Sequence, residues 1–177
     1  MEKTNYTFMR KIVLTGPESS GKSTLLKDIE NKIGLYGVPE YSRIYIDELK
    51  RPYVKDDLLE MAKGQLELES SLREKNNQVL LCDTDLLTIK IWSEFKYGSC
   101  ETYILEQLNN NLPDLYLLTT PEMPWEPDPQ REYPTDRDKL FEIFRQEIIR
   151  LKIPYEVLKG DPLQRLDQFL KLTREFL

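Results

Sequence analysis

The segment Gly16-Pro17-Glu18-Ser19-Ser20-Gly21-Lys22-Ser23 decides how this chain folds, because it fits the G-x-x-x-x-G-K-[ST] pattern of phosphate-binding loops. Residues Lys11 to Thr15, before the loop, form a short apolar run typical of a buried strand. Residues Thr24 to Glu30, after it, are good helix formers with apolar side chains on one face. A strand, a glycine-rich loop and a helix in this order are the context that the motif requires.

The residue types of the loop suit the binding of ATP and Mg²⁺. Gly16 and Gly21 permit backbone angles that a Cβ would forbid, so the loop amides can form an anion nest at a helix N-terminus. Lys22 would reach the β- and γ-phosphates, and the Ser23 hydroxyl would ligate Mg²⁺. We expect the whole loop to hold the nucleotide, through Gly16, Pro17, Glu18, Ser19, Ser20, Gly21, Lys22, Ser23 and Thr24.

The length and the net charge of the chain limit which kinds of protein it can be. The 177 residues suit one domain, and we predict a single domain over residues 1–177. The formal net charge of −6 argues against non-specific binding to nucleic acid. No apolar stretch is long enough to span a membrane, and Met1 to Phe8 lack the apolar core of a signal peptide. We therefore expect a cytoplasmic protein with neither a membrane nor a nucleic acid as partner; the sequence carries no signal for its oligomeric state.

The chain contains no histidine, which excludes any mechanism that needs an imidazole base. Proton transfer must then use a carboxylate, lysine, tyrosine or water. The two cysteines, Cys82 and Cys100, lack metal-like spacing, and we expect both to be reduced and Cys82 to pack in the core.

Strand-like and helix-like segments alternate along the chain, which predicts an α/β fold with helices on both faces of a parallel sheet. We predict a three-layer P-loop kinase-like fold with five parallel strands, near residues Lys11–Thr15, Gly37–Tyr41, Val79–Asp83, Leu115–Thr119 and Tyr155–Leu158. Predicted helices include Asp57–Lys75, a helix from about Asp136 that opens on a Thr135–Asp138 capping box, and a last helix capped by Asp161. Ligands should collect at the carboxyl ends of the strands.

Two carboxylates follow the third predicted strand. Asp83 ends the strand, where a Walker B acidic residue would support Mg²⁺; the alternative is a cap of the next helix. Asp85 could hold a substrate hydroxyl, act as a base, or cap the helix at Leu86, and the sequence favours neither the site nor the cap.

Glu40, Tyr41 and Arg43 follow the second predicted strand, at the edge where small-molecule P-loop kinases bind the acceptor. Glu40 would accept the proton of the acceptor hydroxyl, and Arg43 would pair with phosphate or substrate. The alternative is an ion pair at the surface that contributes little.

Residues 120–138, which we call the lid segment, are broken by prolines and are too polar for the core. Arg131 and Arg137 would offset charge on the transferred phosphoryl group, unless they are solvated surface charges. Trp125, near Asp128, would stack on a flat ligand or else anchor the segment to the core.

Taken together, these motifs resemble a known family, the ribosylnicotinamide kinase domain at the C-terminal end of bacterial NAD-biosynthesis regulators. The resemblance runs from Lys11 onward and rests on the loop, Glu40-Tyr41-Ser42-Arg43, Asp83-Thr84-Asp85, Trp125 with Asp128 and Arg131, and Ile153-Pro154-Tyr155. It implies ATP- and Mg²⁺-dependent phosphorylation of the 5′-hydroxyl of nicotinamide riboside. It also implies that Trp125 stacks on the substrate ring and that acidic residues hold ribose hydroxyls.

The chain departs from this family in two respects. The family's nucleotidylyltransferase and DNA-binding domains do not fit before Lys11, so we expect neither adenylyl transfer nor repression. The lid segment is unusually rich in proline, so another heteroaromatic alcohol is an alternative acceptor. A nucleotide-dependent switch or binding module without an acceptor is the competing function, but such a module has little use for a tryptophan and paired arginines on a flap.

Overall fold

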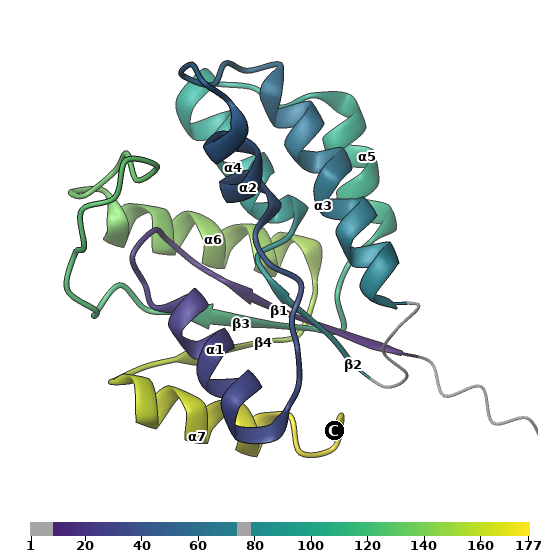
Figure 1. The fold of residues 1–177 in the computed structure, drawn as a ribbon, viewed down its shortest axis with the longest axis vertical. Helices are drawn as coiled ribbons and strands as arrows, with labels where there is room; N and C mark the ends of the chain where they lie inside the picture. The colour runs from purple at the N-terminus through teal and green to yellow at the C-terminus, as the bar shows by residue number, and fades with distance from the viewer. Residues whose placement is uncertain (1–8, 74–78) are drawn as a thin grey trace, which may run out of the picture.

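A parallel sheet lies between two layers of helices in the computed structural model, which describes residues 9–73 and 79–177 (Figure 1). Within those residues the sheet has four strands in the order β2-β1-β3-β4. Their bounds are β1 Arg10–Thr15, β2 Val79–Asp83, β3 Leu115–Thr119 and β4 Tyr155–Leu158. β1 pairs with both β2 and β3, so the loop that follows β1 leaves the sheet near its centre.

Seven helices cover the sheet in the described part of the chain: α1 Lys22–Ile33, α2 Tyr41–Glu48, α3 Asp57–Arg73, α4 Leu86–Tyr97, α5 Thr102–Asn110, α6 Arg137–Leu151 and α7 Pro162–Leu172. Successive β1 residues alternate between two cores, because side chains of a strand point to opposite faces. Ile12 and Leu14 pack with α1 and α7, whereas Val13 packs with α3, α4, α5 and α6. The predicted three-layer α/β arrangement is therefore confirmed.

The strand predicted near Gly37–Tyr41 is wrong. Around Val38 the chain makes only one isolated parallel bridge, to Cys82. The Val38 amide donates to the Leu81 carbonyl at 2.8 Å, and the Val38 carbonyl accepts from the Asp83 amide at 2.8 Å. Pro39 has no amide to continue the ladder, and α2 begins at Tyr41, so the extended segment is too short for a strand.

The ends of three predicted helices can be compared with the structure. α3 is described as far as Arg73, and the last two residues predicted for this helix lie outside the described residues, as does the segment Met1 to Phe8. The predicted Thr135 capping box is wrong: Asp136 is the N-cap of α6 and makes no side-chain cap bond. The Thr135 hydroxyl instead lies 3.5 Å from the Asp136 carboxylate. Asp161 does cap α7, in a full capping box with Gln164.

Cys82 is fully buried in the core and both cysteines are free, as expected. No helix within the described ranges combines the length and the apolar character needed to cross a bilayer.

Candidate functional site

The loop between β1 and α1 is shaped by its two glycines. Gly16 has a φ of +135°, and a Cβ there would lie 2.7 Å from the Thr119 hydroxyl oxygen, so no larger residue fits. Gly21, with a φ of +82°, is the N-cap of α1. Because glycine tolerates these positive φ values, the loop can turn tightly around the N-terminus of α1.

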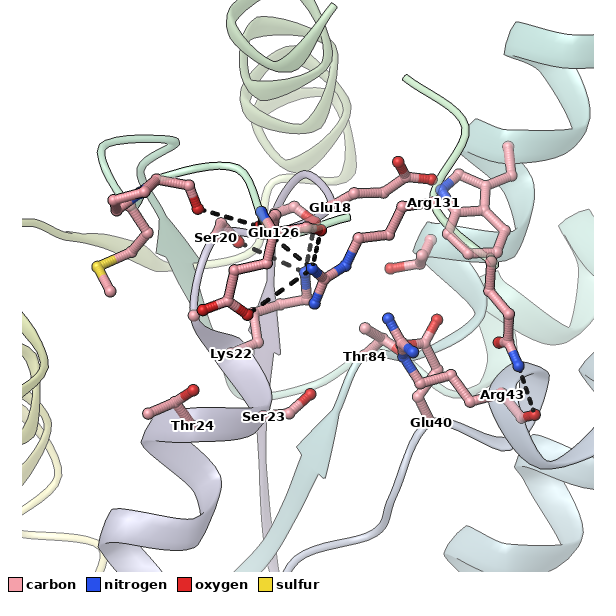
Figure 2. Close-up of a pocket in the computed structure, with 18 residues that line it drawn as sticks. Glu18, Ser20, Lys22, Ser23, Thr24, Glu40, Arg43, Thr84, Glu126 and Arg131 are labelled. Carbon is pink, nitrogen blue, oxygen red and sulfur yellow. Dashed lines mark hydrogen bonds and ion pairs between the residues drawn. The ribbon is translucent and has the colours of Figure 1, made fainter. Parts of the chain in front are cut away.

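Lys22 folds back over this loop (Figure 2). Its ammonium donates to the carbonyl oxygens of Gly16 at 2.9 Å and Pro17 at 2.8 Å. Burial lowers the pKa of Lys22, although the carboxylates of Asp83 and Glu40 act in the opposite direction. The ammonium is thus held over the concave side of the loop, where it can meet an anionic phosphate.

Ser23 and Asp83 meet although 60 residues separate them in sequence. The Ser23 hydroxyl donates to Asp83 Oδ2 at 2.6 Å, while Asp83 Oδ1 is buried without a hydrogen-bond partner. Burial raises the pKa of Asp83, because the carboxylate charge is poorly solvated there. A hydroxyl and a carboxylate with one free buried oxygen fit Mg²⁺, which takes one or two protein oxygens and otherwise water and phosphate.

Glu40 lies beside this pair and just ahead of α2. Burial, together with the nearby Asp83 charge, raises the pKa of Glu40 to about 7. Its carboxylate is 3.5 Å from Arg43 Nε, and Arg43 also donates to Asp128 of the lid segment at 3.0 Å. A carboxylate with a pKa near neutrality can exchange a proton with a substrate hydroxyl at physiological pH.

The lid segment is joined to the loop through Glu18 and Ser19. Glu18 Oε2 accepts from the backbone amides of Glu132 at 3.0 Å and Tyr133 at 3.1 Å. The Ser19 hydroxyl donates to the Pro124 carbonyl at 3.3 Å and accepts from the Glu126 amide at 3.0 Å. The lid segment therefore covers the loop, and two of the four variable positions of the motif, Glu18 and Ser19, hold it there.

The two lid-segment arginines have different surroundings. Arg131 lines the pocket, donates to the Ser19 hydroxyl at 3.4 Å, and has a buried Nε without a partner. Arg137 does not line the pocket: its guanidinium donates to the backbone carbonyls of Met123, at 2.7 and 2.8 Å, and of Pro121. Arg131 can thus face a phosphate, whereas Arg137 fixes the path of the segment.

Asp85 and Tyr41 also do not line the pocket, and the same holds for Pro17, Asp83, Trp125 and Asp128. Asp85 is 1% exposed: one oxygen caps α4 at the Leu87 amide, 3.0 Å away, and the other accepts from the Tyr116 hydroxyl at 2.7 Å. Both oxygens thus accept hydrogen bonds from the protein, as the helix-cap alternative predicts. The Tyr41 ring packs directly on α3, where a Cβ added to Gly64 would lie 2.0 Å from it.

The aromatic wall of the pocket comes from a residue that the sequence argument missed. Trp92, on α4, lines the pocket and is half-buried, whereas Trp125 does not line it. The spacing held the signal: Thr88 and Trp92 are four residues apart on α4 and so share one face of the helix, and Thr84 lies just before the helix, next to Asp83.

Arg165 of α7 is a second residue that the sequence argument missed, and its buried side chain supports the loop. Its side chain is 1% exposed and donates to the carbonyls of Gly160 at 2.8 Å, Thr120 at 3.1 Å and Ser20. A buried arginine must satisfy several donors at once, and here it does so by joining the loop to the ends of β3 and β4.

Four groups of residues line the assembled pocket: the loop with the start of α1, the segment before α2, the start of α4, and the lid segment. Its lining residues are Gly16, Glu18, Ser19, Ser20, Gly21, Lys22, Ser23, Thr24, Glu40, Arg43, Thr84, Thr88, Trp92, Met123, Pro124, Glu126, Gln130 and Arg131. Figure 2 shows Lys22 and Ser23 on one side of the hollow, with Glu40, Arg43 and Thr84 across from them.

Curated proteins similar to this chain are bacterial NAD-biosynthesis regulators. The trifunctional NAD biosynthesis/regulator protein NadR of Escherichia coli is 27% identical over 138 residues, which cover 75% of this chain and 33% of NadR. NadR of Salmonella typhimurium matches to the same extent. The chain thus spans a third of the length of these relatives, and the expected resemblance to this group is confirmed.

Solved structures show the same fold. A NadR crystal structure in complex with NR superposes with a TM-score of 0.77 at 18% identity, covering 96% of this chain and 51% of that one. Deoxyadenosine kinase from M. mycoides with bound dATP superposes with a TM-score of 0.60 at 18% identity, covering 93% and 99%. These likenesses establish a P-loop kinase-like fold.

The sequence profile described as an AAA domain matches residues 11–165. This range begins in β1 and ends at Arg165, so it includes the nucleotide loop, the Asp83 strand, the lid segment and the buried arginine. Because the match covers most of its length, the chain belongs to the AAA domain family.

Proposed function

We propose that this protein is an ATP- and Mg²⁺-dependent kinase of a nucleoside-like alcohol, with the 5′-hydroxyl of nicotinamide riboside as the first candidate acceptor. One observation carries the proposal: one pocket is lined by Lys22 and Ser23 of the loop and also by Glu40, a carboxylate with a pKa of about 7, and by the aromatic ring of Trp92. A switch protein needs the first two features but not the last two.

Each residue has a defined task in this reaction. Lys22 and the loop amides bind the β- and γ-phosphates, and Ser23 with Asp83 holds Mg²⁺, which would neutralise phosphate charge when bound. Glu40 accepts the proton as the acceptor oxygen bonds to the γ-phosphorus and ADP leaves. Arg131 offsets the charge on the phosphoryl oxygens.

The lid segment excludes water from the reaction. It covers the loop through the Glu18 and Ser19 contacts, and Arg43 binds Asp128 on the opposite side. Exclusion of water strengthens each charge interaction inside the pocket and limits transfer of the phosphoryl group to water.

The relatives support the nicotinamide riboside assignment without deciding it. NadR proteins act in NAD biosynthesis by name, and one structure of similar fold contains NR. Deoxyadenosine kinase shares the fold as well, so other nucleosides belong in the same test.

The test is ADP release, with mass detection of products, for nicotinamide riboside, purine and pyrimidine nucleosides, and pyridine alcohols. We expect one acceptor to stimulate ADP release strongly and to gain one phosphoryl group. The folded Lys22→Ala protein should lose this activity. Release that no acceptor stimulates would favour a switch or ATPase, and near-normal transfer by Lys22→Ala would contradict the role of the loop.

A further inference from the structure

Three residues of the α4 region face the pocket at regular spacing. Thr84, Thr88 and Trp92 all line it, and each is four residues from the next. The side chains thus form one stripe that leads away from Asp83. Thr88 and Trp92, both within α4, are about 6 Å apart along the helix axis, from a rise of about 1.5 Å per residue, and Thr84 precedes the helix.

The middle member of this stripe carries a free hydroxyl. Thr88 is 3% exposed, and its Oγ1 is buried with no hydrogen-bond partner. A buried hydroxyl without a partner costs about 1–3 kcal/mol, so it is rare in a native protein unless something else supplies the bond. Since Thr88 lines the pocket, the missing partner can come from a bound molecule.

The first member of the stripe is held in a strained conformation. Thr84 has a φ of +67°, an unusual value for a β-branched residue. Its amide donates to the Leu14 carbonyl at 2.9 Å, which ties this turn to the central strand. Strain of this kind is typical of functional sites, where the fold fixes the direction of neighbouring groups.

The helix that carries the stripe has a rigid start. Asp85 caps it at the Leu87 amide and accepts from the buried Tyr116 hydroxyl of β3. The Thr88 hydroxyl therefore has a fixed position relative to the sheet and the nucleotide loop.

We infer that the Thr88 hydroxyl hydrogen-bonds a polar group in the middle of the acceptor and so determines its specificity. The inference rests on the proposed function. With the reacting hydroxyl at the Asp83 end and a flat ring on Trp92, the middle of the acceptor lies beside Thr88. In a nucleoside that part is the sugar, so the predicted ligand class is a riboside whose 2′- or 3′-hydroxyl bonds Thr88. This role falls to Thr88 because Asp85 is buried, does not line the pocket, and already accepts from Leu87 and Tyr116.

The experiment measures binding, so that it does not depend on turnover. The probes are nicotinamide riboside, adenosine and cytidine with their 2′-deoxy and 3′-deoxy forms, titrated calorimetrically into protein loaded with Mg²⁺ and a non-hydrolysable ATP analogue. We expect wild type to bind a riboside about tenfold more tightly than one of its deoxy forms, from one hydrogen bond of about 1–1.5 kcal/mol.

The matched variants are Thr88→Val, which removes the hydroxyl but keeps the shape, and Thr88→Ser, which keeps the hydroxyl. In Thr88→Val we expect riboside binding to weaken about tenfold. The preference over the deoxy form should disappear, while the melting temperature of the unliganded protein should not fall. Thr88→Ser should retain the preference.

Three outcomes would overturn the inference: equal binding of ribo and deoxy forms by wild type, an unchanged preference in folded Thr88→Val, or no binding of any probe. None of these decides the proposed function, because stimulated ADP release with a pyridine alcohol or any other acceptor would still establish a kinase. Absence of such stimulation, together with tight riboside binding that depends on Thr88, would leave the inference standing and remove the kinase.

Discussion

The Glu18 carboxylate accepts a hydrogen bond from the backbone amide of Tyr133 at 3.1 Å, across 115 residues of sequence. The same oxygen accepts from the amide of Glu132, so one side chain of the nucleotide loop holds two amides of the lid segment. These two hydrogen bonds therefore couple the position of the lid segment to the nucleotide loop.

Glu18→Ala should release this part of the lid segment. Hydrogen bonds to a charged group contribute about 1.5–3 kcal/mol each, so exchange of the Glu132 and Tyr133 amides with solvent deuterium should rise at least about tenfold. Amide exchange followed by mass spectrometry measures this directly. Glu106→Ala, at an exposed position on α5, is the control. Unchanged protection in Glu18→Ala would mean that other contacts hold the segment.

Asp83→Asn should weaken metal binding without lowering the stability of the folded protein. The variant should need far more Mg²⁺ for nucleotide binding and should turn over at least about a hundredfold more slowly, because the buried charge that faces the metal is lost. Since burial already raises the pKa of Asp83, the unliganded variant should be at least as stable as wild type at pH 8. Mg²⁺ titrations and thermal melts measure the two effects.

Asp167→Asn, at an exposed position of α7, is the matched control and should change neither measurement. If Asp83→Asn instead loses stability and keeps its Mg²⁺ dependence, Asp83 has a structural role only.

Glu40 should make the unliganded protein less stable as pH rises. The pKa of Glu40 is raised in the folded state to about 7, from 4.5, so between these values the native state holds more protons than the unfolded chain. The contribution of Glu40 to the free energy of unfolding is complete below about pH 4.5 and is lost as pH rises through 7. The free energy of unfolding falls by at most about 1.4 kcal/mol per pH unit over this range.

Denaturant unfolding at several pH values tests this slope, and Glu40→Gln should flatten it between pH 5 and 7. The same substitution should remove the limb of the turnover profile that rises towards neutral pH, because a glutamine cannot accept the proton. A slope that survives in Glu40→Gln would assign the titration to another group.

The two tryptophans should respond differently to substitution. Trp92→Ala should raise the acceptor KM about ten- to a hundredfold, since stacking of a flat ring on an aromatic contributes about 1–3 kcal/mol. In Trp92→Phe most of this increase in the acceptor KM should be absent. Trp125→Ala should leave the acceptor KM within about threefold of wild type, because Trp125 does not line the pocket. Steady-state kinetics with ATP held saturating distinguish the two, and a larger effect at Trp125 would reverse the assignment.

The local parts of this fold could be predicted from sequence because their causes are local. The glycines, lysine and hydroxyl of the nucleotide loop stand in one run, and the bounds of β3 and β4 follow from short apolar segments between turns. The strand predicted near Gly37–Tyr41 failed because one proline, Pro39, outweighs the extended residues around it.

The site was harder to predict where a side chain had two plausible partners. Asp85 follows Asp83 by two residues in a strand-to-helix turn, yet it points to Tyr116 on β3, a contact visible only in three dimensions. Trp125 and Trp92 are equally aromatic, and only the path of the lid segment decides which one meets the pocket. Long-range packing, not residue chemistry, separates these cases.

The burial of Arg165 against the nucleotide loop has a consequence for synthesis of the chain. Ser20 is made early, but the guanidinium that binds its carbonyl follows 145 residues later. A nascent chain therefore has the motif long before it has the support that fixes the loop. Until α7 has emerged from the ribosome, the loop carbonyls lack their partner, and the unfinished chain should hold nucleotide weakly. The loop therefore gains its buried support only once α7 has been made.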